Sequence, residues 1–366
     1  MRAIVTIFTK SHIAQVRTLS LSLKKHNPTL KIFALLADKA EKNLISSVEP
    51  FELISLESLK DQEIIRKMAF YYSPLEFCCA LRPFLHEYIY TETQIQQWIY
   101  LDSDILVLQS FDGIFQTFEK NSLCLTLHLN YPVKADQLSD RGFYYEAGNL
   151  RYGLYNGGFL GCARSGETEK FIQWFKKKLI HGAFNAIEKG SYLDQLWLNY
   201  VPVYFEGVKI LKQDGVNTAY WNLHERKLEI TDGEIYANNA PLIFFHFSGW
   251  NSESPDKISR LAPWYDFYNN EAWLKLARLY AEEIRGNDFG AGIPCAYAFG
   301  RFNDGKEIGD DMRSAYYKLL NRGDWAFGDP FGNSLFFYNR FRRSFTRIRR
   351  FLERLKAGFK DALKKF

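Results

Sequence analysis

The chain has 366 residues, 47% of them hydrophobic and 24% charged, so it can bury a sizeable core as one large α/β domain or two smaller ones. The formal net charge of +5 is unevenly placed. Residues 340–366 hold 11 Lys/Arg and 2 Asp/Glu, which gives this segment +9 and leaves −4 for the rest. No apolar stretch approaches the roughly 18 residues that span a bilayer, and the acidic body argues against a nucleic-acid partner.

The five cysteines are irregularly spaced and include no CxxC pair. This pattern favours buried thiols in a reduced compartment over a disulfide framework or a zinc site. The first residues enter a strand-like run without a long apolar region or a small-residue cleavage site, so no signal peptide is expected. We therefore expect a cytoplasmic protein, or one that is peripheral at the inner face of the plasma membrane.

Strands alternate with helices along the first hundred residues, which predicts an α/β fold with a mostly parallel sheet and right-handed crossovers. Buried strands are expected at residues 3–8, 30–37, 51–56 and 98–101, with helices at 12–25 and 75–90. Further strands are expected at 121–129, 157–163 and 241–247, a polar loop at 132–152, and helices at 167–181 and 192–200. Residues 285–335 show weak periodicity and are rich in Gly, Asp, Asn and aromatic residues.

Two aspartates follow the strand at 98–101, in the segment YLDSDILV. Asp102 and Asp104 are two residues apart, so along an extended backbone their side chains face the same way. Two like charges beside a core strand need a cation or a hydrogen-bond network. A hard divalent metal accepts carboxylate and diphosphate oxygens and stabilises charge on a leaving diphosphate. A solvated pair of acids at the end of a strand is the alternative interpretation.

Two further segments place polar residues next to apolar ones. Asn156 and Gly157 precede a buried strand, where glycine permits close backbone approach to a ligand but also suits a plain turn. Asp194 and Gln195 begin an aromatic segment, either as a helix cap or as a carboxylate and an amide aimed at a sugar ring.

The last strand and one helix add three more candidates. His246 ends the strand at 241–247 and is either a core residue or a third ligand beside the two aspartates. Trp250 either packs in the core or stacks on a sugar face. Arg82 is a charge within an apolar helix and needs an anionic partner unless it lies on an exposed edge.

Taken in order, several motifs resemble the GT-A-fold glycosyltransferases, most closely the family 8-type group that includes glycogenin and bacterial lipopolysaccharide glycosyltransferases. The motifs are VTIFT, the LR pair at 81–82, YLDSDILV, YNGGFLG, LDQLWLN and HFSGW, and the resemblance covers about residues 1–255. It implies a Rossmann-like sheet with helices on both faces. It also implies metal-dependent, retaining transfer of a sugar from a nucleotide-sugar donor, with a UDP-sugar expected. The acceptor would be a glycan or a lipid-linked glycan. The segments VNTAYWNLHER and YAFGRFNDG are similar to a branch associated with surface-polysaccharide synthesis.

The resemblance also implies roles for individual residues. The ligands of Mn²⁺ or Mg²⁺ would be Asp102, Asp104 and His246. The donor would be bound by Thr9, Asp38, Arg82, Ser103, Gly157, Gly249 and Trp250, and Asn156 and Gly157 would line the sugar-acceptor cleft. The residues nearest the transferred sugar would be Asn156, Asp194 and Gln195, and with retention Asp194 or Gln195 would stabilise an oxocarbenium-like transition state. No Lys-Pro-Trp follows Gly249, which departs from the family pattern.

The basic segment 340–366 carries its apolar residues in steps of three or four, so they form one helical stripe. These residues are Phe341, Phe345, Ile348, Leu352, Leu355, Phe359, Leu363 and Phe366. The pattern favours a helix that lies on an anionic membrane surface. Docking on the rest of the chain, an oligomer contact and nucleic-acid binding are the alternatives.

The predicted organisation is a GT-A catalytic domain at 1–284, an irregular extension at 285–339 and a basic amphipathic helix at 340–366. Two other function classes compete with a sugar transferase. One is a membrane-associated scaffold with an inactive GT-A-like domain, against which the intact Asp, Asn-Gly-Gly and Asp-Gln set argues. The other is a nucleotidyltransferase, which would carry a glycine-rich loop after the first strand, where this chain has TKSHIAQ.

Overall fold

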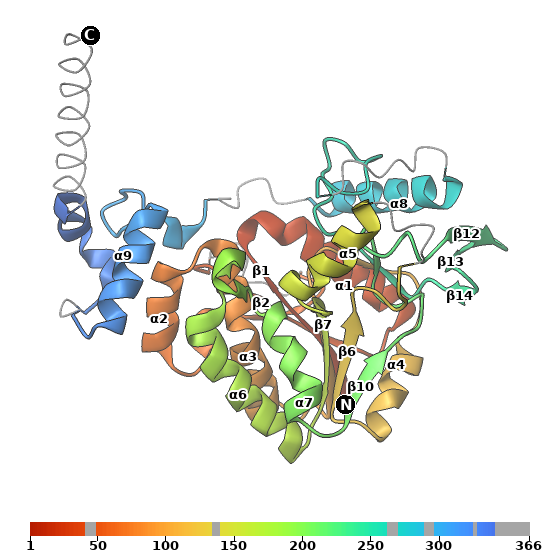
Figure 1. The fold of residues 1–366 in the computed structure, drawn as a ribbon, viewed down its shortest axis with the longest axis horizontal. Helices are drawn as coiled ribbons and strands as arrows, with labels where there is room; N and C mark the ends of the chain where they lie inside the picture. Colours follow the sequence, from red (N-terminus) through yellow and green to blue (C-terminus); the bar gives the residue numbers. More distant parts are fainter. Residues whose placement is uncertain (41–48, 134–139, 262–269, 289–295, 325–327, 341–366) are drawn as a thin grey trace, which may run out of the picture. The chain divides into compact units, whose positions relative to one another are not determined.

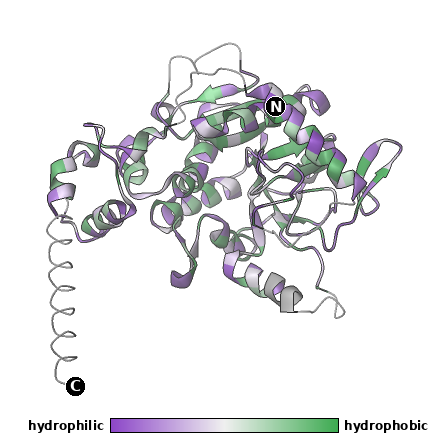
Figure 2. Ribbon diagram, turned by 90° about the horizontal axis from the view of Figure 1, so that it is seen from above, coloured by the Kyte–Doolittle hydropathy of each residue, from purple (hydrophilic) through white to green (hydrophobic). Residues whose placement is uncertain are grey.

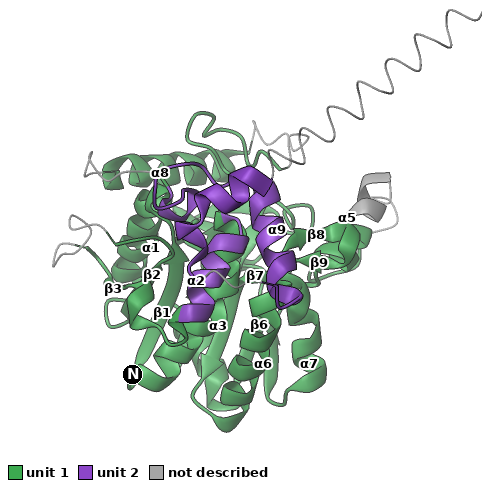
Figure 3. Ribbon diagram, turned by 90° about the vertical axis from the view of Figure 1, so that its left-hand side faces the viewer, with its two compact units in different colours: residues 1–62, 74–296 green, residues 63–73, 297–366 purple. Residues whose placement is uncertain are grey.

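A computed structural model describes the chain except for residues 41–48, 134–139, 262–269, 289–295, 325–327 and 341–366 (Figure 1). The chain divides into two compact units, residues 1–62 with 74–296 and residues 63–73 with 297–366 (Figure 3). Every predicted site residue belongs to the first unit. The predicted basic helix lies outside the described residues apart from Arg340.

The first unit contains a seven-stranded sheet with the strand order β10-β6-β7-β4-β1-β2-β3. Its strands are β1 (Arg2–Phe8), β2 (Lys31–Leu36), β3 (Glu52–Ile54), β4 (Gln97–Leu101), β6 (Leu123–Leu127), β7 (Tyr155–Ala163) and β10 (Val208–Leu211). Neighbours are parallel, except that β7 runs antiparallel to β4 and β6. One sheet edge therefore collects the carboxyl ends of β1, β2, β4, β6 and β10 and the amino end of β7. The predicted α/β class with a mostly parallel sheet is confirmed.

Helices cover both faces of this sheet. Ile4, Phe8 and Ile99 face one side and join a core cluster with α1 (Ile13–His26) and α4 (Asp112–Gln116). Trp98 and Tyr100 point to the other side, since alternate residues of a strand face opposite ways. There they meet α3 (Pro74–Glu92), and the Trp98 indole donates to His86 Nδ1 at 2.8 Å. In Figure 2 the strands are mostly hydrophobic, whereas the helices carry both hydrophobic and hydrophilic residues.

The other helices of the first unit are α5 (Asp140–Tyr152), α6 (Gly166–Gly182), α7 (Val201–Tyr204) and α8 (Glu271–Asn287). Three smaller sheets complete this unit. The first joins β11 (Thr218–Ala219), β15 (Phe244–His246) and β5 (Ile105–Val107), and the second joins β12 (Leu228–Thr231), β13 (Glu234–Ala237) and β14 (Ala240–Pro241). The third joins β8 (Asn185–Ala186) and β9 (Ser191–Tyr192). Short 3₁₀ helices span Lys10–His12, Leu56–Ser58, Thr117–Glu119, Ile187–Lys189, Gln195–Tyr200, Ala298–Gly300 and Pro330–Gly332.

Two sequence predictions are wrong in part. Residues 132–152, expected as a loop, contain α5, because contacts such as Tyr152 on Tyr192 at 5.0 Å add to the weak helix propensity of this Gly- and Asn-containing segment. The helix expected at 192–200 is instead the end of β9 followed by a 3₁₀ helix. Leu193, at φ 51°, breaks the helical path there.

The second unit contains α2 (Gln62–Tyr71) and α9 (Asp310–Asn321), and residues 334–340 are helical. Phe70 lies at its centre, with ring centroids 4.8 Å from Tyr316 and 5.1 Å from both Phe331 and Phe337. The buried Arg313 donates to the carbonyl oxygens of Phe70, Tyr72 and Phe299. These contacts explain how a segment with weak periodicity still packs an aromatic core. Within the described part of the chain, no helix has the length and apolar character to cross a membrane.

Candidate active site

Asp102, Asp104 and His246 form a compact cluster at the carboxyl end of β4. One ligand atom from each lies within 4.8 Å of the others, and no other such group of three occurs among the described residues. His246 Nε2 is 3.1 Å from Asp104 Oδ1 and 3.8 Å from Asp102 Oδ2. The pairing of β15 with β5 creates this arrangement, because it sets His246 opposite Ile105, next to Asp104. The cluster joins residues more than one hundred positions apart.

Asn217 settles which nitrogen of His246 carries the proton. The amide nitrogen of Asn217 donates to Thr126 Oγ1 at 2.8 Å and to Asn156 Oδ1 at 3.0 Å. The Asn217 oxygen therefore faces His246 Nδ1, at 3.3 Å, and accepts its N–H. This leaves the lone pair of Nε2 directed at the two aspartates, as a metal-binding histidine requires.

Electrostatics within the cluster favour the charged form of Asp104. Burial raises the pKa of Asp104, but the charge and hydrogen bond of His246 outweigh it and lower this pKa. Burial likewise lowers the pKa of His246, and the Asp104 and Asp102 carboxylates outweigh it and raise this pKa. The negative potential of the two acids thus draws a cation to this place, either a proton on the ring or a metal ion.

Arg82 links the aspartate pair to Asp194. Its guanidinium donates to Asp102 Oδ1 at 2.7 Å, to Asp194 Oδ2 at 2.5 Å and to the carbonyl of Gly157. It also lies over the ring of Tyr100, whose hydroxyl donates to Asp102 Oδ1 at 2.7 Å. Burial lowers the pKa of Arg82, but the two carboxylates outweigh it and raise this pKa, so the guanidinium stays charged. The predicted anionic partners of Arg82 are therefore carboxylates of the chain itself.

Asp194 and Gln195 are buried, at 2% and 9% exposed. Burial raises the pKa of Asp194 while Arg82 lowers it, and the net direction is upward. The Gln195 oxygen accepts the backbone N–H of Gly157 at 3.0 Å and the Asn156 amide at 3.3 Å, and its nitrogen donates to the Tyr152 carbonyl at 2.9 Å. Both polar ends of Gln195 are thus held in one orientation.

The two glycines at 157 and 158 leave room for these side chains. A Cβ on Gly157 would lie 2.6 Å from an Arg82 nitrogen, and one on Gly158 would lie 2.4 Å from His246 Cε1. Real Cβ contacts are not that short, so any larger residue would displace the site. The Asn-Gly-Gly sequence is therefore needed for packing around the cluster and not for a turn, since it lies inside β7.

The predicted nucleotide contacts follow the neighbouring strands. Thr9, after β1, has its hydroxyl 3.0 Å from Ser11 Oγ and from His12 Nδ1. Asp38, after β2, is 1% exposed and lies 3.5 Å from the buried Lys10 Nζ. Ser103 is half-buried between the two aspartates. The structure thus brings these residues to the sheet edge of the cluster, and their contact with a nucleotide stays a prediction.

The segment after β15 packs beside α8. Gly249 has φ 71°, a left-handed conformation that glycine adopts without strain. The Trp250 indole donates to the Pro255 carbonyl at 3.2 Å, and its ring meets Tyr280 edge to face at 4.9 Å. Packing accounts for these Trp250 contacts, and its stacking on a sugar stays a prediction.

Four residues of the site lie outside the predicted set. Asn217, His128 and Trp221 surround His246 and Asn156, and Tyr100 bonds Asp102. Trp221 lies edge to face with His246 at 5.1 Å, and His128 Nε2 is 3.3 Å from the Asn156 amide. The sequence carries a signal for three of them, because Asn217 and Trp221 lie in the segment VNTAYWNLHER and Tyr100 lies in the motif YLDSDILV. Nothing in the sequence marks His128.

No family model matches this chain. It is similar to two uncharacterised proteins of Bacillus subtilis strain 168. YfnD is 27% identical over 279 residues, covering 74% of this chain and 84% of YfnD. YfnF is 24% identical over 265 residues, covering 71% and 85%.

Among solved structures, the chain is similar to the galactosyltransferase LgtC in complex with donor and acceptor sugar analogues. That match has 17% identity, 78% of this chain and 95% of that chain covered, and a TM-score of 0.48. It is also similar to the glycosyltransferase GlyE of Streptococcus pneumoniae TIGR4, at 17% identity, 80% and 64% coverage and a TM-score of 0.42. These likenesses are weak, so the function proposed below rests on the geometry of the chain itself.

Proposed function

We propose that this chain is a metal-dependent glycosyltransferase that moves a sugar from a nucleotide-sugar donor, expected to be a UDP-sugar, to a glycan or glycolipid acceptor. The observation that carries the proposal is the cluster of Asp102, Asp104 and His246 at the carboxyl edge of a mostly parallel sheet, where ligands of such sheets bind. The ordered motifs support a family 8-type enzyme of a surface-polysaccharide pathway, with retention of anomeric configuration.

The cluster fits Mn²⁺ or Mg²⁺. The cluster offers two carboxylates and the Nε2 lone pair of a neutral imidazole, which suit a first-row or hard divalent ion. The hydrogen bond from Nδ1–H to Asn217 fixes the orientation of the ring. When bound, the metal supplies Lewis-acid stabilisation of the negative charge on the leaving diphosphate. His246 and the two aspartates would hold it, and Arg82 keeps Asp102 in place.

The remaining residues would act on the transferred sugar. Asp194 is fixed by Arg82, so we propose that it offers a buried negative charge to an oxocarbenium-like transition state instead of acting as a strong base. Gln195 accepts the backbone N–H of Gly157, Asn156 accepts that of Gly158, and the Asn156 amide donates to Gln195. We propose that Thr9, Asp38 and Ser103 bind the nucleoside, from the β1 and β2 side of the cluster.

The direct test is turnover of UDP-glucose and UDP-galactose, followed as UDP release with and without Mn²⁺. We expect metal-dependent release by the wild-type chain and at least a 100-fold loss in Asp102→Asn and Asp104→Asn. Asp112→Asn is the matched control, because Asp112 is an exposed acid outside the cluster. Full activity of either cluster variant, or in excess EDTA, would contradict the proposal. A folded chain that binds vesicles but turns over no donor would favour the inactive scaffold.

We propose a peripheral membrane site for residues 340–366, on the basis of the helical stripe in the sequence. Each Arg or Lys near an anionic surface contributes about 1 kcal/mol. The full-length variant carrying R342Q, R343Q, R349Q and R350Q should therefore co-sediment far less with phosphatidylserine vesicles than the wild type does. Equal sedimentation of the two proteins would refute this role, and it would leave the transferase proposal untouched.

A further inference from the structure

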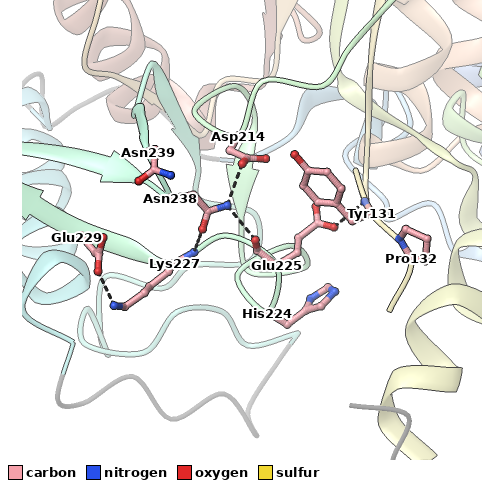
Figure 4. A pocket seen from close by; sticks show the side chains of 9 residues that line it. All are labelled: Tyr131, Pro132, Asp214, His224, Glu225, Lys227, Glu229, Asn238 and Asn239. Carbon is pink, nitrogen blue, oxygen red and sulfur yellow. Dashed lines mark hydrogen bonds and ion pairs between the residues drawn. The ribbon is translucent and has the colours of Figure 1, made fainter. Parts of the chain in front are cut away.

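A separate polar pocket lies beyond the carboxyl ends of β6 and β10, at the same sheet edge. Figure 4 shows the side chains that line it. Its volume is about 600 Å³, within the range of small-molecule sites. Tyr131 follows β6 and Asp214 follows β10. Lys227 precedes β12, Glu229 lies in β12, and Asn239 lies in the turn between β13 and β14. We call it the β10 pocket. The proposed metal cluster and sugar residues do not line it.

The strand order sets the distance between this pocket and the proposed metal cluster. The cluster follows β4, and β6 and β10 are the second and third strands from β4 in the sheet. Neighbouring strands lie about 4.8 Å apart, so the pocket is on the order of 10–15 Å away along the sheet edge. Thr9 and Asp38 follow β1 and β2, on the opposite side of β4. A nucleotide at β1 and β2 would leave the β10 pocket to the acceptor.

One loop connects the two places. Asp214 and Glu225 line the pocket, whereas Asn217 and Trp221, between them in the sequence, contact His246. Arg226 holds this loop by donating to the carbonyls of Asp214 and Val216. A ligand in the pocket would therefore rest on the segment that orients the catalytic histidine.

The pocket carboxylates are already fixed in position. Glu225 accepts the backbone N–H groups of Asn130 at 2.8 Å and Tyr131 at 3.0 Å. Asp214 accepts the amide of Asn238 at 2.8 Å, and Asn238 also donates to the Glu225 carbonyl (Figure 4). Each carboxylate oxygen can accept more than one hydrogen bond. Rigid acceptors of this kind suit the hydroxyl groups of a sugar, which are donors.

The charge of the pocket selects among sugars. Three acids, Asp214, Glu225 and Glu229, line the pocket. Lys227 pairs with Glu229, and the buried Arg226 lies 3.5 Å from Glu225, so the acids outnumber the cations by one. Burial lowers the pKa of His224, so it adds no positive charge at neutral pH. Phosphate and carboxylate groups would be repelled. Tyr131 is 49% exposed and offers an apolar ring face for the C–H surface of a sugar.

We propose that the β10 pocket is a distal acceptor subsite for an uncharged sugar unit of an oligosaccharide, a proposal that rests on the transferase function above. Binding is measured by calorimetry on the full chain with UDP and Mn²⁺ present, with glucose, maltotriose, cellotriose and trigalacturonic acid as probes. At least one neutral trisaccharide should bind 10-fold or more tightly than glucose, and trigalacturonic acid should bind far more weakly.

The variants Tyr131→Ala and Asn239→Ala should each weaken trisaccharide binding about 10-fold and leave UDP release to water unchanged. Both residues are exposed, so these variants should fold, and Tyr204→Ala is the matched control because it removes an exposed tyrosine outside the pocket. The subsite is overturned if no neutral trisaccharide binds the wild type, or if both variants bind as the wild type does. Asp104→Asn separates the two proposals, since it should abolish turnover and retain trisaccharide binding.

Discussion

Gly158 is the position where one added methyl group should be most informative. Its Cβ in Gly158→Ala would lie 2.4 Å from His246 Cε1 and 2.8 Å from Asn156 Oδ1. An ordinary contact begins at 3.4 Å, so the imidazole would have to move by about 1 Å. A misplacement of that size in a site can cost about 100-fold in rate, and overpacking costs about 1–3 kcal/mol of stability.

The assay compares Gly158→Ala with Gly113→Ala, whose added Cβ meets nothing within 4 Å. UDP release should fall about 100-fold in the first variant only, and its Mn²⁺-induced thermal shift should shrink. Urea unfolding should show a loss of about 1–3 kcal/mol for Gly158→Ala. Normal turnover and a normal Mn²⁺ response in Gly158→Ala would refute the role of His246 beside β7. An equal loss in Gly113→Ala would show that the effect is not local.

Three further predictions follow from single contacts. Arg82→Lys keeps the charge, but its single nitrogen replaces two guanidinium nitrogens, one on Asp194 and Gly157 and the other on Asp102. Turnover should therefore fall at least 100-fold, and urea unfolding should show a loss of about 1–3 kcal/mol. Unchanged turnover would contradict the bridge. Asn217→Gly tolerates the φ of 56° at this position and removes the amide that orients His246. Mn²⁺ affinity measured by calorimetry should therefore drop about 10- to 100-fold. An unchanged affinity would contradict the assignment of the His246 proton to Nδ1. Burial and, to a smaller extent, the charge of Arg82 lower the pKa of His86 to about 3. As the pH drops from 6.5 towards 3, the His86 imidazole is therefore protonated in the unfolded chain but not in the folded chain. The free energy of unfolding should fall over this range by about 1.4 kcal/mol per pH unit. His86→Asn keeps an acceptor for the Trp98 indole and should flatten that acid limb in urea unfolding measured from pH 7 to 4; an identical limb in both proteins would exclude His86 as its source.

The local pattern of the sequence was sufficient for six of the seven strands of the central sheet, and only β10 was not predicted. Continuous apolar runs at β1, β2 and β4, with amphipathic segments between them, define buried parallel strands whatever the rest of the chain does. The spacing of Asp102 and Asp104 likewise follows from the backbone alone, as does their place after a strand. Segments without such periodicity, 140–152 and 193–200, were predicted wrongly because their conformation depends on tertiary contacts and on the positive φ of Leu193.

The family resemblance implied the ligand set Asp102, Asp104 and His246, but only the tertiary structure decided how the polar residues contact one another. His246 meets Asp104 because β15 pairs with β5, a register that no local pattern encodes. The same holds for Asn217, whose amide is oriented by partners from β6 and β7. Arg82 could be identified in the sequence as a buried charge in need of an anion, but its choice of Asp102 and Asp194 required the packing of α3 on the sheet. Sequence specifies the residues able to hold a metal, and long-range pairing brings their atoms within reach of one ion.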